Sequence, residues 1–226
     1  MDVALQLVLG AVVGYVFGML PTGMIVGRAL GVDLTKVGSG RTGATNALRT
    51  LGVKWAAVVA VGDLLKGVVP VLLVGWLTLG APWWGAPTWG QVAAASFAVL
   101  GHTFSPLIGF RGGRGIVTGG GGLLALCWPG FVVALVCGAV AIWLTRYVSL
   151  GSLVGTVVAG AMVIGLALAG AAPAPFYLYG TALPAFIILA HRDNIQRLLS
   201  GTERKLSAGR RKAPPPTSPH CDGEGR

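Results

Sequence analysis

Long apolar blocks, each close to the length of a membrane-spanning helix, constrain the fold of this chain more than any other feature. Its 226 residues are 54% hydrophobic and only 11% charged, with a mean hydropathy of +0.76. Because about 20 apolar residues cross the hydrocarbon core as a helix, the sequence predicts an all-α polytopic membrane protein. About seven transmembrane helices are expected, at residues 3–26, 55–79, 89–108, 114–127, 130–147, 150–170 and 173–190. Six spans are the alternative, with 101–127 forming one broken hairpin.

The basic residues of the predicted loops fall on one side of the membrane only. The loops around 80–88, 127–130 and 170–173 contain no Lys or Arg. By the positive-inside rule, the N-terminus is expected outside and the C-terminus in the cytoplasm. The basic residues assigned to the cytoplasmic loops, apart from those of the tail, are Arg28, Lys36, Arg41, Arg49, Lys54, Arg111, Arg114 and Arg146.

Residues 1–205 are expected to form a single integral-membrane domain, and residues 206–226, rich in proline and charge, a disordered cytoplasmic tail. The net charge of +10 does not indicate nucleic-acid binding, because the charges lie in membrane-proximal loops and help to set topology. No cysteine spacing or other cluster indicates a metal site, so neither a metal nor another cofactor is predicted. A Walker A loop and a G-x-S-x-G elbow are also absent from the sequence.

A first polar stretch, "VGSGRTGATNALRTLG", runs from Val37 to Gly52. Its glycines at 38, 40 and 43 allow the backbone to turn tightly and direct several N–H groups at one anion. Gly38, Gly40, Gly43, Thr45 and Asn46 are therefore predicted to bind a substrate phosphate. Arg49 follows one helical turn later. An ordinary glycine-rich connecting loop is the alternative.

A second stretch, "GHTFSPLIGFRGGRG", places two arginines around a Gly-Gly pair. A guanidinium group grips phosphate oxygens through two parallel hydrogen bonds. Arg111, Gly112, Gly113 and Arg114 are therefore predicted to bind phosphate, although these arginines could instead set topology and contact lipid headgroups. His102 on its own is better interpreted as a residue at a helix end.

Two further polar groups lie in or beside the predicted spans. In "HRDNIQRLLSGTERK", His191 and Asn194 share a helical face and could hydrogen-bond a polyol, although an amphipathic juxtamembrane helix explains this stretch equally well. Asp63 and Lys66 lie within the second predicted span. Because intramembrane charges are costly, we expect these two to pair with each other or to face a cavity, and structural pairing is favoured over catalysis.

The three stretches, in this order between apolar spans, closely resemble the bacterial acyl-phosphate:glycerol-3-phosphate acyltransferase family (PlsY). The likeness extends to "LPTG" at 20–23 and "GDLLKGVVPV" at 62–71. It implies a seven-helix inner-membrane enzyme that transfers an acyl group from acyl phosphate to the 1-position of glycerol 3-phosphate, without metal or acyl-CoA. The products would be lysophosphatidic acid and phosphate, at the first step of phospholipid synthesis. A functional link to the enzyme that forms acyl phosphate is a further expectation.

The resemblance also suggests roles for individual residues. Ser39, Arg49, His191 and Asn194 are expected at the catalytic centre, with His102 and Glu203 supporting it. A substrate phosphate, and not a protein base, is expected to accept the proton. The chain departs from the family pattern in two places: Arg41-Thr42 stands where Asn-Pro is usual, and Arg111 and Arg114 stand where lysines are usual.

Two other functions fit parts of the sequence. Broken, glycine-rich helices with intramembrane charges are typical of transporters for small anions. No inverted repeat supports this alternative, and the polar stretches lie at one face of the membrane instead of its midplane. A catalytically silent assembly partner would explain the apolar spans but not the phosphate-binding residues.

Overall fold

The computed structural model describes residues 1–79 and 88–206, and every regular element in these ranges is a helix. The outer loop predicted around 80–88 and the tail predicted at 206–226 lie almost entirely outside the described residues. The helices are α1 (Val3–Gly18), α2 (Thr22–Ala29), α3 (Ala44–Thr50), α4 (Val53–Leu79), α5 (Trp89–Thr103), the 3₁₀ helix η1 (Pro106–Ile108), α6 (Ile116–Leu126), α7 (Trp128–Thr145), α8 (Val148–Leu168), α9 (Pro175–Ala190) and α10 (Arg192–Leu199).

The apolar helices lie where the hydropathy of the sequence placed them. Five segments are long and apolar enough to cross a membrane: Val3–Ala29, Val53–Thr78, Trp89–Ile108, Trp128–Thr145 and Val148–Leu168. Two further apolar helices, α6 and α9, are shorter than a full span. Residues 101–127 contain the end of α5, a loop with η1, and α6. The prediction of an all-α membrane protein with several spans is therefore confirmed.

The first predicted span, 3–26, is not one continuous helix, which corrects the prediction. Helix α1 ends at Gly18 and α2 begins at Thr22. The Leu20 carbonyl in the break accepts a hydrogen bond from Lys66 Nζ on α4 at 3.0 Å. That carbonyl also accepts the Thr22 backbone N–H at 3.1 Å. Since backbone polar groups inside an apolar layer need partners, the second donor, from another helix, stabilises the break. Hydropathy averages could not reveal it.

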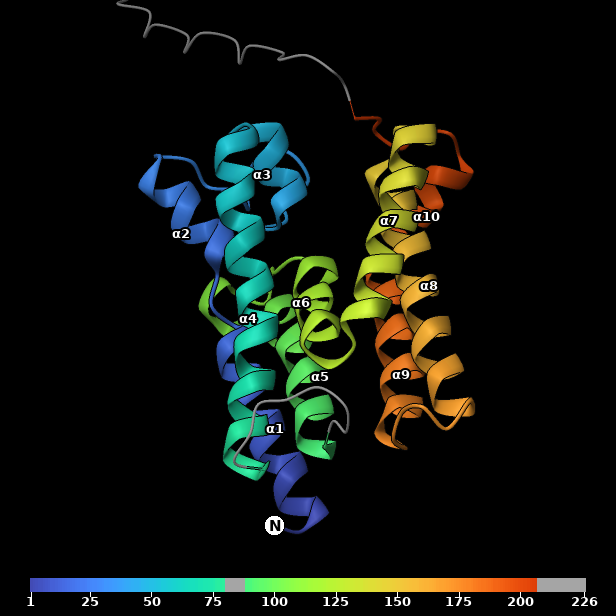
Figure 1. The fold of residues 1–226 in the computed structure, drawn as a ribbon. Coiled ribbons are helices and arrows are strands. Elements are labelled where there is room, and N and C mark those ends of the chain that lie inside the picture. The colour runs from blue at the N-terminus through green and yellow to red at the C-terminus, as the bar shows by residue number, and fades with distance from the viewer. Residues whose placement is uncertain (80–87, 207–226) are drawn as a thin grey trace, which may run out of the picture.

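The helices form two groups, which Figure 1 shows clearly. Helices α1 to α6 pack together on one side, and α7, α8 and α9 with the short α10 form the other. In the first group, α1 presents glycines at 10, 14 and 18 to α5, and a Cβ at any of them would overlap an α5 carbonyl oxygen. Small residues at four-residue spacing allow this close approach in a membrane. The candidate site lies where the two groups meet.

Candidate active site

A polar cavity of about 260 Å³ lies between the two helix groups. Residues from all three predicted polar stretches line it, although they are far apart in the sequence. Gly38, Gly40, Arg111 and Gly112 are predicted site residues that do not line it. The predicted residues that do are Ser39, Gly43, Thr45, Asn46, Arg49, His102, Gly113, Arg114, His191, Asn194 and Glu203.

Asn46 orders the first glycine-rich loop from within. Its side chain is 3% exposed, and Nδ2 lies within 3.1 Å of the carbonyl oxygens of Leu34, Val37 and Arg41. Its Oδ1 accepts the Ser39 backbone N–H at 3.0 Å. The amide therefore has no free donor for a phosphate, contrary to the predicted role. It instead holds the turn that carries Ser39 at the cavity wall.

The second glycine-rich loop rests on the C-terminal turn of α5. A Cβ at Gly112 would overlap the carbonyl oxygen of His102, and a Cβ at Gly113 would overlap the His102 ring. Both positions therefore require glycine because of close packing, whereas the sequence suggested phosphate binding. His102 supports the loop, and its Nδ1 lies 3.6 Å from Asp63 Oδ1. Arg111 is exposed outside the cavity.

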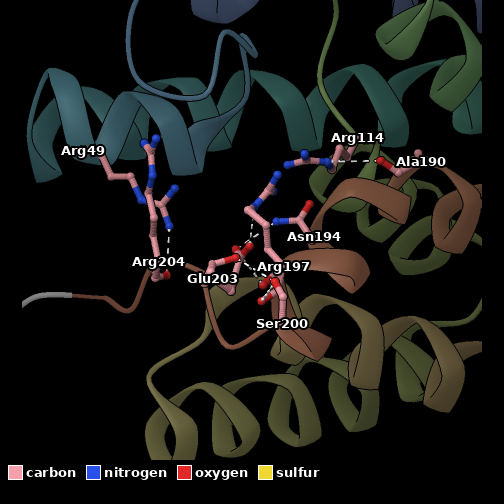
Figure 2. A network of polar contacts seen from close by, with 10 residues as sticks. Arg49, Arg114, Ala190, Asn194, Arg197, Ser200, Glu203 and Arg204 are labelled. Atoms are coloured by element: carbon pink, nitrogen blue, oxygen red, sulfur yellow. Dashed lines mark hydrogen bonds and ion pairs between the residues drawn. The ribbon is translucent and has the colours of Figure 1, made fainter.

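Arg114 and Arg41 connect this loop to the rest of the site. Arg114 Nε donates to the Ala190 carbonyl at the end of α9 at 3.1 Å, as Figure 2 shows. Arg41 also lines the cavity, and its Nη1 donates to the Gly112 carbonyl at 3.4 Å. Burial is the main cause that lowers the pKa of Arg114, and the nearby charge of Arg41 lowers it further. Two guanidinium groups held this close favour a bound anion.

His191 follows α9 and is 3% exposed. Its Nδ1 lies 2.8 Å from the Ile187 carbonyl oxygen. A carbonyl only accepts, so Nδ1 carries the proton, and in the neutral ring Nε2 is a hydrogen-bond acceptor. Burial lowers the pKa of His191, and Arg114 adds to this lowering. The ring is therefore neutral at physiological pH and suited to accept a hydrogen bond from a hydroxyl group.

Glu203 is the centre of a polar network between α8 and α10 (Figure 2). Its Oε1 accepts Ser149 Oγ–H and Asn194 Nδ2–H, both at 2.9 Å, and its Oε2 accepts Arg197 Nε–H at 2.8 Å. Burial alone would raise the pKa of Glu203, but these three hydrogen bonds outweigh burial and lower it. Glu203 thus fixes Asn194, whose Oδ1 is buried without a partner. That oxygen is an unused acceptor.

Arg49 lies at the edge of the cavity, on α3. It donates from Nη2 to the Arg204 carbonyl at 3.4 Å, across the gap between the two helix groups (Figure 2). Partial burial lowers the pKa of Arg49, and repulsion from Arg204 lowers it further. Arg49, Arg41 and Arg114 therefore provide cationic donors at the same cavity.

The sequence interpretation missed Ser149 and assigned no role to Arg197. Ser149 stands in the first turn of α8, just before the apolar block predicted to begin at 150. Only its hydrogen bond to Glu203 distinguishes it from the small residues of that block. Arg197 could have been found, because it is basic and shares a helical face with Asn194 on α10. The charge pattern alone did not indicate its acidic partner.

A second cavity, of about 320 Å³, adjoins the polar one and is lined almost entirely by apolar groups. Helices α6, α7, α8 and α9 surround it. Ile116, Val117, Ile142 and Ser152 line both cavities, so the two lie side by side. A polar, cationic pocket next to an apolar one is suited to an amphiphile with an anionic head.

Asp63 and Lys66 form the expected ion pair within the apolar layer. Lys66 Nζ lies 2.8 Å from Asp63 Oδ1, and both side chains are buried. Asp63 also accepts a hydrogen bond from Thr22 Oγ1 at the start of α2. The pair therefore connects α4 to the break between α1 and α2. Among the described residues, no group of three His, Cys, Asp or Glu side chains is arranged to hold a metal ion.

Proteins of known function match this chain over nearly its whole length. The sequence profile of the glycerol-3-phosphate acyltransferase family matches residues 8–201. Glycerol-3-phosphate acyltransferase 1 of Deinococcus radiodurans is 41% identical over 209 residues, which cover 89% of this chain and 96% of that protein. The glycerol-3-phosphate acyltransferase of Rubrobacter xylanophilus is 43% identical over 204 residues, which cover 88% of this chain and 94% of that protein.

The fold matches solved structures as well. The crystal structure of PlsY, an integral membrane glycerol 3-phosphate acyltransferase, in its glycerol 3-phosphate form superposes with a TM-score of 0.79 at 32% identity, covering 89% of this chain and 96% of that one. Its lysophosphatidic acid form gives a TM-score of 0.77 at 31% identity, and the match covers 88% of this chain and 94% of that one. With the family profile and the two relatives, these matches show that the chain belongs to the PlsY family of integral membrane glycerol-3-phosphate acyltransferases, which produce lysophosphatidic acid.

Proposed function

We propose that the polar cavity binds acyl phosphate and glycerol 3-phosphate together and transfers the acyl group to the sn-1 hydroxyl. The hydroxyl oxygen forms an ester bond with the acyl carbon, and the bond from that carbon to the phosphate oxygen breaks. Inorganic phosphate leaves with the electron pair, and a substrate phosphate accepts the hydroxyl proton. The observation that carries this proposal is the cationic cavity that shares lining residues with an apolar one.

Positioning accounts for most of the catalysis in this proposal. Acyl phosphate is an activated mixed anhydride, so the protein has to bring two anions together and orient one hydroxyl. Arg49 and Arg114 neutralise the two phosphates and stabilise the departing one, and Arg41 assists them. His191 Nε2 and Asn194 Oδ1, the acceptors at the cavity wall, orient the glycerol hydroxyls together with Ser39. No metal ion or other cofactor takes part in these steps.

The remaining predicted residues take supporting roles. Gly43 and Thr45 contribute to the wall that faces the donor phosphate, and Gly38, Gly40 and Asn46 maintain the shape of that loop. Gly112 and Gly113 position Arg114 by packing against His102, while Glu203 positions Asn194. Arg111, outside the cavity, is assigned to lipid headgroups or to initial attraction of the anionic substrates.

The acyl chain lies in the apolar cavity, with its reactive end at the boundary shared with the polar one. The small residues of "GSLVGTVVAGAMVIG" serve both functions suggested by the sequence. Gly151 and Gly155 line the cavity, and a Cβ at Gly155 would lie 3.1 Å from the Ala134 carbonyl oxygen, so α7 and α8 also approach closely there. Burial of the chain contributes about 0.8 kcal/mol per methylene.

The orientation in the inner membrane follows from the charge asymmetry. The N-terminus is placed outside and the C-terminus in the cytoplasm, with the polar cavity facing the cytoplasm, where soluble glycerol 3-phosphate is found. Residues 1–205 constitute the catalytic domain, and 206–226 a tail that is dispensable for turnover.

Phosphate release by purified protein, with palmitoyl phosphate and with or without glycerol 3-phosphate, tests the proposal. Release that depends on glycerol 3-phosphate and yields lysophosphatidic acid is expected, with none from palmitoyl-CoA. Arg49→Ala should reduce turnover at least about 100-fold, because the lost donor acts on developing charge. Lys36→Ala, an exposed basic residue on the same face, is the matched control. Folded protein that binds glycerol 3-phosphate but turns over neither donor would favour anion transport instead.

A further inference from the structure

The apolar cavity has a defined end remote from the polar cavity. It begins at Ile142 and Ser152, which also line the polar cavity, and extends to Leu123, Phe131, Val163 and Tyr179. These last four residues, here called the cavity floor, come from α6, α7, α8 and α9 respectively. One helix alone does not close the cavity.

Close packing of three helices blocks the space beside the floor. A Cβ placed on Gly130 of α7 would lie 3.8 Å from both Leu123 Cδ1 of α6 and Met162 Cβ of α8. The Phe131 ring approaches α6, because a Cβ placed on Gly120 would lie 3.4 Å from its Cε2. Val163 and Tyr179 are 1% and 4% exposed. An extended chain that reaches this level therefore meets well-packed side chains.

Tyr179 gives the floor rigidity. Its hydroxyl group donates to the Gly119 carbonyl of α6 at 3.4 Å, which joins α9 to α6 across the cavity. A buried tyrosine hydroxyl that keeps a partner holds its ring in one orientation. Leu123, Val163 and Tyr179 belong to the same buried apolar cluster as Phe176, so the floor is part of the packed core and not a loose flap.

The depth of the cavity matches one membrane-length acyl chain. Ser152 and Val163 lie about 17 Å apart along α8, at a helical rise of about 1.5 Å per residue. The hydrocarbon core of a bilayer is about 30 Å thick and contains two leaflets of chains, so one chain spans about 15 Å. A chain of ordinary membrane-lipid length that starts at the shared boundary would end at the floor.

We propose that Phe131, Val163 and Tyr179 determine which acyl-chain lengths the enzyme uses, by stopping the chain at the floor of the apolar cavity. This inference rests on the proposed placement of the acyl chain and adds a substrate preference to it. The donor that fits best is the one whose extended chain matches the distance from the shared boundary to the floor. A longer chain must bend or leave part of its length outside the cavity, and a shorter one leaves apolar surface unfilled.

Two substitutions with opposite effects test the role of the floor. Phe131→Ala removes the ring from the floor and should shift the preference toward stearoyl and arachidoyl phosphate. Ala159→Phe places a ring in the cavity nearer the polar end and should shift the preference toward lauroyl and myristoyl phosphate. One methylene in an apolar pocket changes the discrimination between two substrates about tenfold or more. We therefore expect each variant to change the ratio of kcat/KM between long-chain and short-chain donors at least about tenfold.

The experiment supplies lauroyl, myristoyl, palmitoyl, stearoyl and arachidoyl phosphates in competition and measures the lysophosphatidic acids by mass spectrometry. Competition yields the ratios of kcat/KM directly, and these ratios do not depend on the amount of folded enzyme. Val157→Phe, on the exposed face of α8, and Trp143→Ala, on the exposed face of α7, are matched controls that should keep the wild-type distribution.

Opposite shifts in the two cavity variants, with unchanged controls, would support the inference. If both variants turn over but give the wild-type distribution of products within about twofold, the floor does not determine the acyl-chain preference, although the proposed function stands. If one variant does not fold, the other still tests the inference, because each variant has its own expected direction of change in chain-length preference. Wild-type protein that makes no product from any donor would overturn the proposed function and this inference with it.

Discussion

At the scale of single residues, the structure separates side chains that face the cavity from those that hold others in place. Asn46 and Glu203 lie at the cavity wall, yet their hydrogen-bonding capacity is used mainly within the protein. His191 Nε2 and Asn194 Oδ1 remain available as acceptors. A residue type at a motif position therefore does not reveal its role, because that depends on which of its atoms are already bonded.

The buried His191 ring predicts an acid limit to turnover. Its pKa lies below the ordinary value of 6.5, so the ring is neutral near pH 7 and becomes protonated only as the pH falls below that value. Protonation removes the Nε2 acceptor and adds a charge beside Arg114, so we expect kcat/KM to fall with decreasing pH. Since the folded protein resists this proton more than the unfolded chain does, stability also falls in the same direction.

The ratio of wild-type to His191→Asn kcat/KM, measured between about pH 5 and pH 8, checks this prediction. Because both enzymes act on the same substrates, the effect of pH on the protonation of the substrates cancels in the ratio. The ratio should be constant at high pH and decline below pH 6.5, and a flat ratio would contradict the prediction. A general base would cost about 10²–10⁴-fold when removed, so a His191→Asn variant with nearly full turnover at pH 8 excludes that role.

Gly112 is predicted to tolerate no side chain. A Cβ there would overlap the His102 carbonyl oxygen, a backbone atom that no rotamer change can move. The loop would have to shift and carry Arg114 with it, and displacement of a binding group by about 1 Å can cost 100-fold in rate. Gly112→Ala should therefore reduce turnover by about that factor. Gly165→Ala, where no atom lies within 4 Å of the added Cβ, should have the wild-type rate.

At the scale of helices, the buried Asp63–Lys66 pair holds α4 against the break between α1 and α2. Lys66→Met leaves Asp63 buried without its ion-pair partner and loses the hydrogen bond to Leu20. Breaking such a pair costs about 3–5 kcal/mol, whereas replacing both partners by uncharged residues costs less. Thermal unfolding in detergent should therefore show a large decrease in Tm for Lys66→Met and a smaller one for Asp63→Asn/Lys66→Met.

Lys54→Met, which alters an exposed lysine near the start of the same helix, should leave the Tm unchanged. If the double variant is as unstable as Lys66→Met alone, an unpaired Asp63 is not the cause of the loss. The break itself would then depend mainly on the lysine donor to Leu20.

At the scale of the whole molecule, the site exists only because two helix groups meet. The Arg49–Arg204 and Arg114–Ala190 hydrogen bonds cross between them. The apolar cavity has α6 from one group and α7, α8 and α9 from the other as its walls. In the proposed function, the acyl chain therefore also binds at this interface.

The orientation of the molecule in the membrane can be tested with its own cysteine. Cys221, in the tail, is expected on the cytoplasmic side, whereas Cys127 is buried in the turn between α6 and α7 and Cys137 lies within α7. A membrane-impermeant maleimide should label intact spheroplasts weakly and inverted vesicles strongly. Cys221→Ser should abolish the difference. Strong labelling of intact spheroplasts would place the C-terminus outside and contradict the topology.

The sequence by itself determined what depends on composition and local pattern. Apolar blocks near the bilayer thickness can only form helices there, so the class of fold and the location of most helices could be read directly. Motifs kept together along the chain indicated the family and most of the cavity residues. Such signals depend only on neighbouring residues, so they can be read without knowing which helices are in contact.

Only the tertiary structure decided what depends on contacts between distant segments. Pro21 is a local signal for the break after Gly18, but the Lys66 donor that stabilises the break comes from another helix. Ser149 owes its role to Glu203, 54 residues away. Asn46 and Gly112 owe theirs to the way their own loops fold back, which no periodicity reports, and Arg111 lies outside the cavity. Hydropathy reports the cost of removing a residue from water, whereas these features are set by which atoms remain unpaired once the helices have packed.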